Sequence, residues 1–375
     1  MIDRMVSIIL KEFRQISRDK RTLGLLIVIP SFLLVIMGYA INFDIKHIPI
    51  AAYDQEKSRD SREFVSAFTT SEYFDLKYDL NSSQEANELI DGGKVRVAVI
   101  IPRDFSNNII AGRTAYIQVI IDAADANTAS TAIGYIDAIA ADYSNKIMVK
   151  EMRRMGRSNY QPIDFRPRIW YNPELRSAKF LVPGLIGFIL TITAVISTAL
   201  SIVREKERGT MEQIVLSPIK PGELILGKLI PYALIAFVTT ALILLAGYVF
   251  FGVSIKGSIA LLFLTTFVFI LAALSIGLFI STIATTQQLA FQISALASLL
   301  PTMILSGFVF PIRSMPVAVQ VLSNITPAKF YLVILRSIIL KGVGLSAFWP
   351  QVLYLLLFAG VLMTISTFRF QKRMK

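Results

Sequence analysis

The sequence contains no cysteine and a single histidine, His47. A chain without cysteine forms no disulfide and offers no thiolate for nucleophilic or redox chemistry. One histidine, with no cysteine or second histidine to join it, argues against a zinc-type site. We therefore expect no catalytic residue and no metal site in this chain, and we do not expect it to be an enzyme.

Charge of either sign is missing from several long stretches. Residues 22–43, 180–203 and 229–255 contain no Asp, Glu, Lys or Arg. Each stretch is longer than the roughly 20 apolar residues that cross ~30 Å of hydrocarbon. Hydrophobic residues make up 54% of the chain, and its mean hydropathy is +0.60. These features indicate an integral membrane protein.

Six hydrophobic runs predict an α-helical polytopic membrane protein with both termini on one side. Lys and Arg beside spans mark the cytoplasmic side, and the expected inner segments hold fifteen of them against five in the short outer segments. We therefore expect both termini in the cytoplasm. The net charge of +12 reflects this placement beside spans and does not indicate a nucleic-acid partner. The expected spans are residues 22–43, 180–203, 229–255, 257–284, 289–310 and 343–368, followed by a cytoplasmic tail at residues 369–375.

Residues 44–179 are polar and alternate short apolar runs with helical stretches. This pattern predicts a compact α/β domain inserted between the first and second spans. With cytoplasmic termini the domain faces outward, which in a double-membraned bacterium is the periplasm, and the protein lies in the inner membrane. Asp122, Asp125 and Asn127 follow one of the expected strands. They can bind a cation, although helix capping is the commoner role for such residues.

Residues 1–21 predict a basic amphipathic helix at the inner membrane interface. Ile9, Phe13 and Ile16 continue a three- and four-residue spacing that begins at Ile2 and Met5. A signal peptide is the alternative, but the run at residues 22–43 is too long for the hydrophobic region of one. The residues of interest on this interface helix are Lys11, Glu12, Phe13, Arg14, Arg18 and Asp19.

Residues 204–228 form a short charged segment between two charge-free runs, so we expect a loop on the cytoplasmic face. The charges alternate in sign from Arg204 to Arg208, Gly209 and Thr210 interrupt the run, and a second amphipathic stretch ends before Pro218. A segment with both signs suits the docking of a soluble partner, while an ordinary topogenic loop is the alternative.

The order of residues in this segment resembles the coupling loop of the ABC-2-type (type V) export permeases. Their pattern is E-R/K-E-x-G-T-x-E-Q, followed by Pro and then L-G-K. In that family the loop touches a separate cytoplasmic ATPase subunit. The resemblance therefore implies that coupling to an ATPase involves Glu205, Lys206, Glu207, Arg208, Gly209, Thr210, Glu212, Gln213, Pro218, Gly227 and Lys228, with Leu226 completing the match.

The resemblance covers essentially the whole chain. The interface helix is similar to the amphipathic entry helix of these permeases, and residues 311–342 are similar to their outer hairpin, which we expect to be broken and partly re-entrant. The large insertion resembles the drug-efflux branch, which implies a periplasmic membrane-fusion protein, an outer-membrane channel and a sister permease as partners. The hairpin residues that carry the resemblance are Gly307, Pro311, Met315, Pro316, Pro327 and Arg336.

Two features of the spans have competing interpretations. Gly222, Gly227 and Lys228 imitate a phosphate-binding loop, but residue 229 is Leu rather than Ser or Thr and no strand precedes. We therefore expect no cofactor in this chain, with ATP and magnesium bound by the partner ATPase.

The small-xxx-small pairs Ala273 with Gly277 and Ser294 with Ser298 permit close helix packing, either within the chain or at a dimer seam with a copy or sister chain.

The sequence lacks an evident means of driving transport by itself. No Asp or Glu follows Glu223 in the final 152 residues, and ion-coupled carriers usually need an ionisable group at membrane depth. Our leading hypothesis is a permease subunit that moves a lipophilic or amphiphilic, drug-like substrate outward, driven by a separate ATPase. The alternatives are a carrier that coordinates sodium through broken helices, and a non-transporting sensor or scaffold that uses the outer domain.

Overall fold

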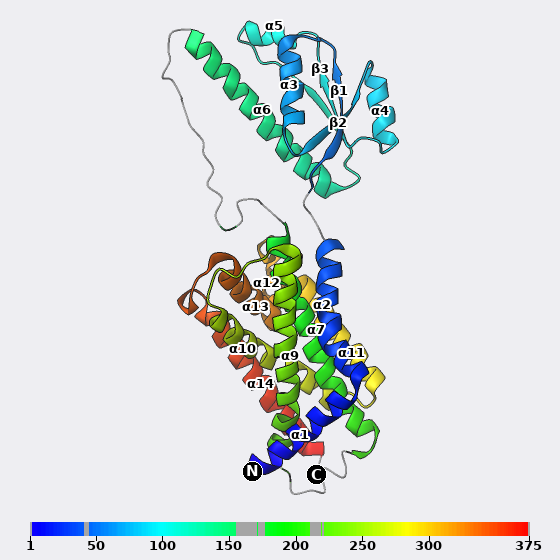
Figure 1. The fold of residues 1–375 in the computed structure, drawn as a ribbon, viewed down its shortest axis with the longest axis vertical. Coiled ribbons are helices and arrows are strands. Elements are labelled where there is room, and N and C mark those ends of the chain that lie inside the picture. The colour runs from blue at the N-terminus through cyan, green and yellow to red at the C-terminus, as the bar shows by residue number, and fades with distance from the viewer. Residues whose placement is uncertain are drawn as a thin grey trace. The chain divides into compact units, whose positions relative to one another are not determined.

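The structure, a computed structural model, describes residues 2–40, 45–154, 171, 177–210, 219 and 221–373. The chain divides into two compact units. One is the membrane unit, Met1–Asn42 with Ile169–Lys375, and the other is the inserted domain, Phe43–Arg168. Figure 1 shows a helical bundle in the first unit and a sheet flanked by helices in the second.

Six helices of the membrane unit are long and apolar enough to cross a bilayer. The chain is therefore a polytopic membrane protein by length and composition. The spanning helices are α2 (Lys20–Ala40), α7 (Ser177–Glu207), α9 (Pro221–Phe251), α10 (Ile259–Ile283), α11 (Gln287–Leu305) and α14 (Trp349–Arg373), and α1 (Ile2–Arg18) precedes them.

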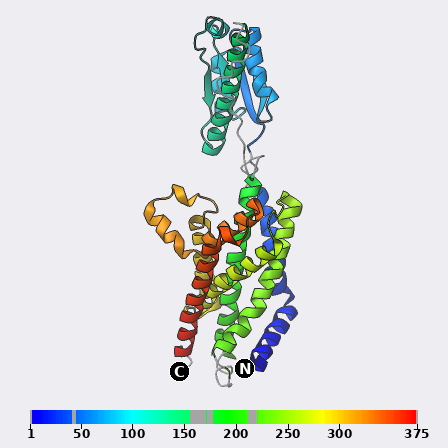
Figure 2. The same ribbon diagram turned by 90° about the vertical axis from the view of Figure 1, so that its left-hand side faces the viewer.

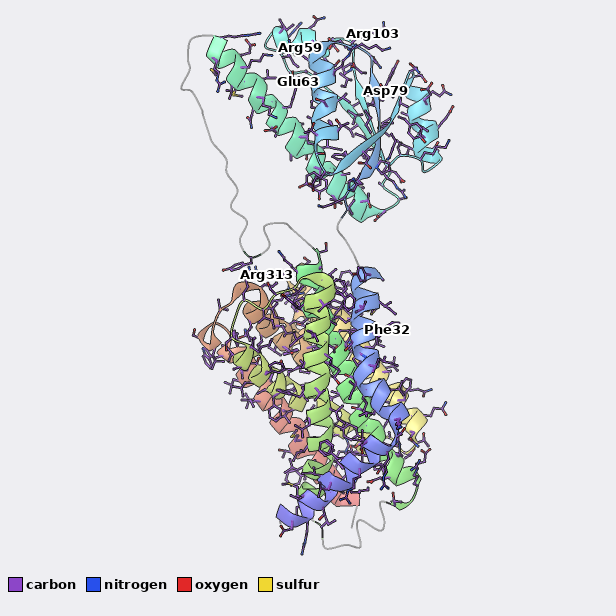
Figure 3. The ribbon with its side chains drawn as sticks, viewed as in Figure 1. Phe32, Arg59, Glu63, Asp79, Arg103 and Arg313 are labelled. Atoms are coloured by element: carbon purple, nitrogen blue, oxygen red, sulfur yellow. The ribbon has the colours of Figure 1, made fainter. Side chains whose placement is uncertain are left out.

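Helix α7 is the centre of the bundle. It is the most buried of the spanning helices, and α2, α9, α10, α11 and α13 all pack on it. Its residues join both apolar clusters of the bundle, one around Leu185 and Ile189 and the other around Val195 and Ile202. By contrast, α2, α11 and α14 keep large apolar side chains exposed; Phe32 on α2, labelled in Figure 3, is 61% exposed. Such faces suit contact with lipid.

The positions of the helix ends show at which end of the bundle the termini and the inserted domain are attached. Helix α1 begins and α14 ends at the same end, whereas α2 ends and α7 begins at the opposite end (Figures 1 and 2). The inserted domain is therefore connected at the end away from the termini, because one spanning helix precedes it and five follow it. That the end with both termini faces the cytoplasm is a prediction from the Lys and Arg distribution.

A broken hairpin lies between α11 and α14. Its two arms, Val317–Ile325 and Pro327–Lys341, meet at an 89° bend, and one part of it projects to the side of the bundle in Figure 2 (orange). Pro327 occupies the first turn of α13, where the missing N–H costs no hydrogen bond. The hairpin comprises η1 (Ile312–Ser314), α12 (Val317–Leu322), η2 (Ser323–Ile325), α13 (Pro327–Arg336) and the π-helical η3 (Ser337–Lys341), and η4 (Leu345–Ala347) leads into α14.

Several helix ends differ from the charge-based expectation. The third spanning helix begins at Pro221, not at residue 229, so Lys228 lies inside α9. Helix α11 ends at Leu305 and α14 begins at Trp349. A charged residue ends a hydrophobic run without ending a helix. Helix α9 instead begins at Pro221, which suits a first turn, and α11 ends just before the turn at Gly307.

The inserted domain is a three-layer α/β domain, as the alternation predicted. Its sheet has the order β2-β1-β3-β4, with β1 parallel to β2 and β3, and β4 antiparallel to β3. Helices α3 and α6 cover one face and α4 the other (Figure 1). Helices α3 and α4 lie on opposite faces because the right-handed crossovers from β1 to β2 and from β2 to β3 run in opposite directions across the sheet. The elements are β1 (Ile48–Asp54), α3 (Arg59–Thr70), β2 (Phe74–Asp79), α4 (Ser83–Asp91), β3 (Val97–Ile101), α5 (Phe105–Ile110), β4 (Gln118–Ile121) and α6 (Ala126–Arg154).

Local capping explains where these helices begin. The Ser58 hydroxyl accepts a hydrogen bond from the Ser61 N–H at the start of α3, and the Ser82 hydroxyl does the same for Glu85 at the start of α4. Asp122, one of the three candidate cation ligands, accepts from the Ala124 N–H and pairs with Arg96. Within the described ranges, no three metal-ligand side chains come together.

Candidate functional site

Four charged side chains meet where α1 crosses the lower ends of α7 and α9. Lys228 Nζ lies 3.0 Å from Glu12 Oε1 and 2.8 Å from Glu205 Oε2. Lys11 pairs with Glu205 and lies 3.5 Å from Glu12. Glu12, Glu205 and Lys228 are only 2%, 5% and 3% exposed. We call this set of four residues the ion cluster.

The ion cluster exists because α1 presents an acid on its buried face. Ile8, Glu12 and Ile16 are four residues apart, and all three are buried. The predicted apolar stripe shared Ile16 with this face, but it ran through Ile9 and Phe13, which are only half buried. The four-residue spacing of Glu12 from Ile8 and Ile16 was a signal for a buried acid on α1, although not for the residues that pair with it.

A glycine allows α1 to approach α9 this closely. A Cβ added at Gly227 would lie 2.8 Å from Ile8 Cγ2, a distance that real side chains do not adopt. Lys228, the next residue, then reaches Glu12 one turn further along α1. The L-G-K end of the loop pattern thus has a physical meaning: the glycine admits the interface helix, and the lysine bonds to it.

The electrostatics of the cluster are balanced within the chain. Two cations face two carboxylates, and a buried charge is tolerated only when it is paired in this way. Burial by itself lowers the pKa of Lys11, but hydrogen bonding and attraction from Glu205, together with the charge of Glu12, raise that pKa above its ordinary value of 10.5. Lys11 therefore remains charged at neutral pH.

The residues beside Glu205 attach the end of α7 to three further helices. Lys206 donates to the backbone oxygen of Ser281 on α10 and lies 6.0 Å from the centre of the Phe370 ring on α14. On α11, Gln287 accepts from Arg204 and donates to Glu207. A short charged run thus contacts α1, α9, α10, α11 and α14, so a force applied there reaches most of the bundle.

Beyond Glu207 the chain turns. Gly209 has a φ of +70°, the left-handed conformation that ends many helices, and the Thr210 hydroxyl donates to the backbone oxygen of Glu205. Glu207, Arg208, Gly209 and Thr210 are exposed. Glu212, Gln213 and Pro218 lie outside the described residues.

The predicted coupling residues therefore fall into two groups. Glu207 and Arg208 are exposed and accessible to a partner, whereas Glu205, Gly227 and Lys228 face other helices of the same chain. On the interface helix, Arg14 and Arg18 are exposed, Phe13 is half buried, and Asp19 lies at the break between α1 and α2.

The four small residues of the spans are buried inside the bundle. A Cβ at Gly277 would lie 2.4 Å from the Val195 backbone oxygen, so only glycine permits this packing of α10 on α7. Ala273, Ser294 and Ser298 are at most 1% exposed, and α11 also packs on α7. The geometry matches the intramolecular alternative, and these positions are not accessible to a second copy.

The predicted hairpin residues mark its bends. Gly307 has a φ of +79° just after α11. Pro311 precedes η1, and Met315 and Pro316 separate η1 from α12. Arg336 ends α13 and donates from Nη1 to the Gly307 backbone oxygen at 3.1 Å. The structure thus brings Gly307 and Arg336 together across the hairpin.

Comparison with known proteins decides the family. Residues 20–368 match the model of the ABC-2 family transporter protein. The chain belongs to the ABC-2 transporter family. It is 36% identical to an Escherichia coli protein named "Probable multidrug ABC transporter permease YbhS", over 90% of this chain and 89% of that one. The E. coli permease YbhR, named in the same way, is 31% identical over 93% of each chain.

A third relative has a more general name. The E. coli "Inner membrane transport permease YhhJ" is 31% identical over 97% of this chain and 96% of its own. These matches span nearly the full length of both partners, and they confirm the resemblance drawn from the loop at residues 204–228. The chain is a permease subunit of an ABC exporter, and its family implies a partner ATPase subunit and a second permease subunit.

Proposed function

We propose that the partner ATPase docks on the exposed end of α7 around Glu207 and Arg208, and that the ion cluster transmits its movement to the bundle. The observation that carries this proposal is the burial of Glu12, Glu205 and Lys228 in one cluster that joins α1, α7 and α9. Displacement of any one helix would separate buried charges, so the three helices move as a rigid unit. In this proposal ATP and magnesium belong to the ATPase and not to this chain.

The proposed orientation places this docking surface in the cytoplasm. Both termini then lie inside, and the inserted domain lies outside, in the periplasm of a bacterium whose inner membrane holds the permease. The excess of Lys and Arg beside the inner segments supports this arrangement. The inserted domain is the surface on which we propose that a membrane-fusion protein, leading to an outer-membrane channel, docks.

The proposed substrate is a lipophilic or amphiphilic, drug-like molecule that moves outward. Two relatives are named multidrug permeases, and the chain has no Asp or Glu after Glu223, so the path it lines in these spans has no carboxylate. The path is expected at the interface with a second copy or a sister permease.

The docking proposal is tested by charge reversal at Glu207, on the exposed end of α7, and at Glu212, further along the loop at residues 204–228. Glu207→Lys and Glu212→Lys are expected to abolish co-purification of the ATPase and ATP-driven export. Glu63→Lys, the same change on the exposed face of α3 in the inserted domain (Figure 3), is the matched control. It should leave ATPase co-purification intact, and also ATP-driven transport in proteoliposomes that lack the membrane-fusion protein. Docking and export at wild-type levels in both reversal variants would contradict the proposal.

A further inference from the structure

The guanidinium of Arg336 is fixed in place but only partly bonded. Nη1 donates to the backbone oxygen of Gly307 at 3.1 Å, and the carbon of the group lies 3.9 Å from the centre of the Phe180 ring. The carbonyl and the ring set both the position and the plane of the group. Its other nitrogens, Nε and Nη2, are buried, and no described residue accepts a hydrogen bond from them.

These two nitrogens form one edge of the planar group. On that edge the Nε–H and one Nη2–H point in the same direction, which is the geometry that binds a carboxylate or phosphate with two parallel hydrogen bonds. Arg336 as a whole is only partly buried, but donor atoms that are buried without an acceptor are unfavourable. Two such donors on one edge of the same group are therefore an unusual feature. The edge has the form of an anion site.

The residues that the structure describes do not provide the anion. No Asp or Glu follows Glu223 in the sequence, and no described carboxylate pairs with Arg336. The neighbouring charges are also positive. The backbone of Lys256 and Gly257 bonds to Ile339 and Ile338, just beyond Arg336, and Lys341 lies on η3. The described part of the chain thus leaves this edge without an anion.

We propose that Arg336 recognises the anionic headgroup, a phosphate or a carboxylate, of an amphiphile at this end of the bundle. The proposal rests on the export function and narrows its substrate class to acidic amphiphiles, unless the bound molecule is a resident membrane lipid. Because Nε and Nη2 are buried, the headgroup reaches them when the side chains that cover this edge move aside, while the Gly307 carbonyl and the Phe180 ring still hold the plane of the guanidinium. Binding then supplies the acceptors that the edge lacks.

The first test measures headgroup binding without the ATPase. The purified full chain is titrated, in neutral nanodiscs, with phosphatidylglycerol and with phosphatidylcholine as the neutral probe. Wild type should prefer phosphatidylglycerol, and Arg336→Gln should weaken that binding by about tenfold or more, because the variant loses the charge and the paired donors that bind the headgroup. Arg336→Lys keeps the charge but not the paired donors, and it should recover only part of the affinity.

Arg313, an exposed cation on the same hairpin (Figure 3), provides the matched control. Arg313→Gln should bind phosphatidylglycerol as wild type does. Equal binding of the two lipids by wild type, or full recovery by Arg336→Lys, would overturn the proposal. If Arg336→Gln does not fold, Arg336→Lys is compared with wild type directly. Weaker binding of phosphatidylglycerol by Arg336→Lys supports the proposal, and equal binding overturns it.

The second test separates a transported molecule from a resident lipid. ATP-driven export of an anionic and of a cationic amphiphile is compared in proteoliposomes that contain the ATPase. Selective loss of anionic export in Arg336→Lys identifies the site as a substrate site, whereas weakened phosphatidylglycerol binding with both exports retained identifies a resident-lipid site. Failure of wild type to export either compound refutes the proposed function and leaves the binding result standing.

Discussion

The ammonium of Lys228 lies between two buried carboxylates, and this single residue holds three helices together. Its partners, Glu12 and Glu205, come from positions 216 and 23 residues away in the chain. Desolvation makes such a cluster a weak source of net stability, but removing one member leaves a buried charge uncompensated. The cluster is therefore best understood as a device that fixes the relative position of the helices.

Replacement of Lys228 by Met is expected to destabilise the membrane unit by about 3–5 kcal/mol, because Glu12 and Glu205 then lose their shared cation. Lys228→Arg keeps the charge and should retain most of the stability. Adding Glu12→Gln to Lys228→Met removes one orphaned carboxylate and should recover part of the loss. Thermal unfolding of the purified protein measures all three. Equal stability of Lys228→Met and wild type would show that the cluster is not buried in solution.

Replacement of Gly227 by Val is expected to force α1 away from α9. The new side chain would occupy the space of Ile8, and overpacking of this kind costs about 1–3 kcal/mol. Adding Ile8→Ala should restore both stability and ATPase coupling. Gly222→Ala is the matched control on the same helix, since nothing lies near a Cβ at that position. A Gly227→Val protein with normal coupling would mean that this helix crossing is unimportant.

At the scale of elements, the inserted domain contains an ion pair that depends on pH. Arg96 pairs with Asp122 and so joins the start of β3 to the end of β4. The Ala124 N–H and then Arg96 lower the pKa of Asp122 below its ordinary value of 3.8. A lowered folded-state pKa stabilises the domain above that ordinary value, and the contribution is lost as the pH falls through the folded pKa.

The unfolding temperature of the inserted domain should therefore decrease as the pH is lowered from 5 toward 3. Asp122→Asn should be less stable at pH 5 and should show a smaller decrease. Calorimetry of the full chain can follow this transition. An identical pH dependence in wild type and Asp122→Asn would rule out this carboxyl as its source.

The orientation of the elements can be tested with introduced cysteines, because the chain has none of its own. Ile110 on α5 is 78% exposed, and Arg208 after α7 is exposed. In right-side-out spheroplasts a membrane-impermeant maleimide should label Ile110→Cys and leave Arg208→Cys unlabelled until the cells are opened. The reverse labelling would place the coupling segment outside the cell and refute the proposed topology.

At the scale of the whole molecule, the sequence predicted the architecture well and the site only in part. Charge-free runs located the six spanning helices, and alternation indicated the α/β character of the inserted domain, because both patterns follow from burial along a single segment. The loop pattern identified the family. The ion cluster was missed because Glu12, Glu205 and Lys228 meet only after three helices pack, and no local pattern specifies that contact. Likewise, the bond from Arg336 to Gly307 joins two ends of the hairpin.

The central claim is that this permease has no means of driving transport by itself and is moved by a separate ATPase through the end of α7. Reconstitution into proteoliposomes tests it most directly, with transport measured with and without the ATPase, ATP and an ion gradient. We predict transport only when the ATPase and ATP are both present, and its loss in Glu207→Lys. Transport by the permease alone under an ion gradient would contradict the account.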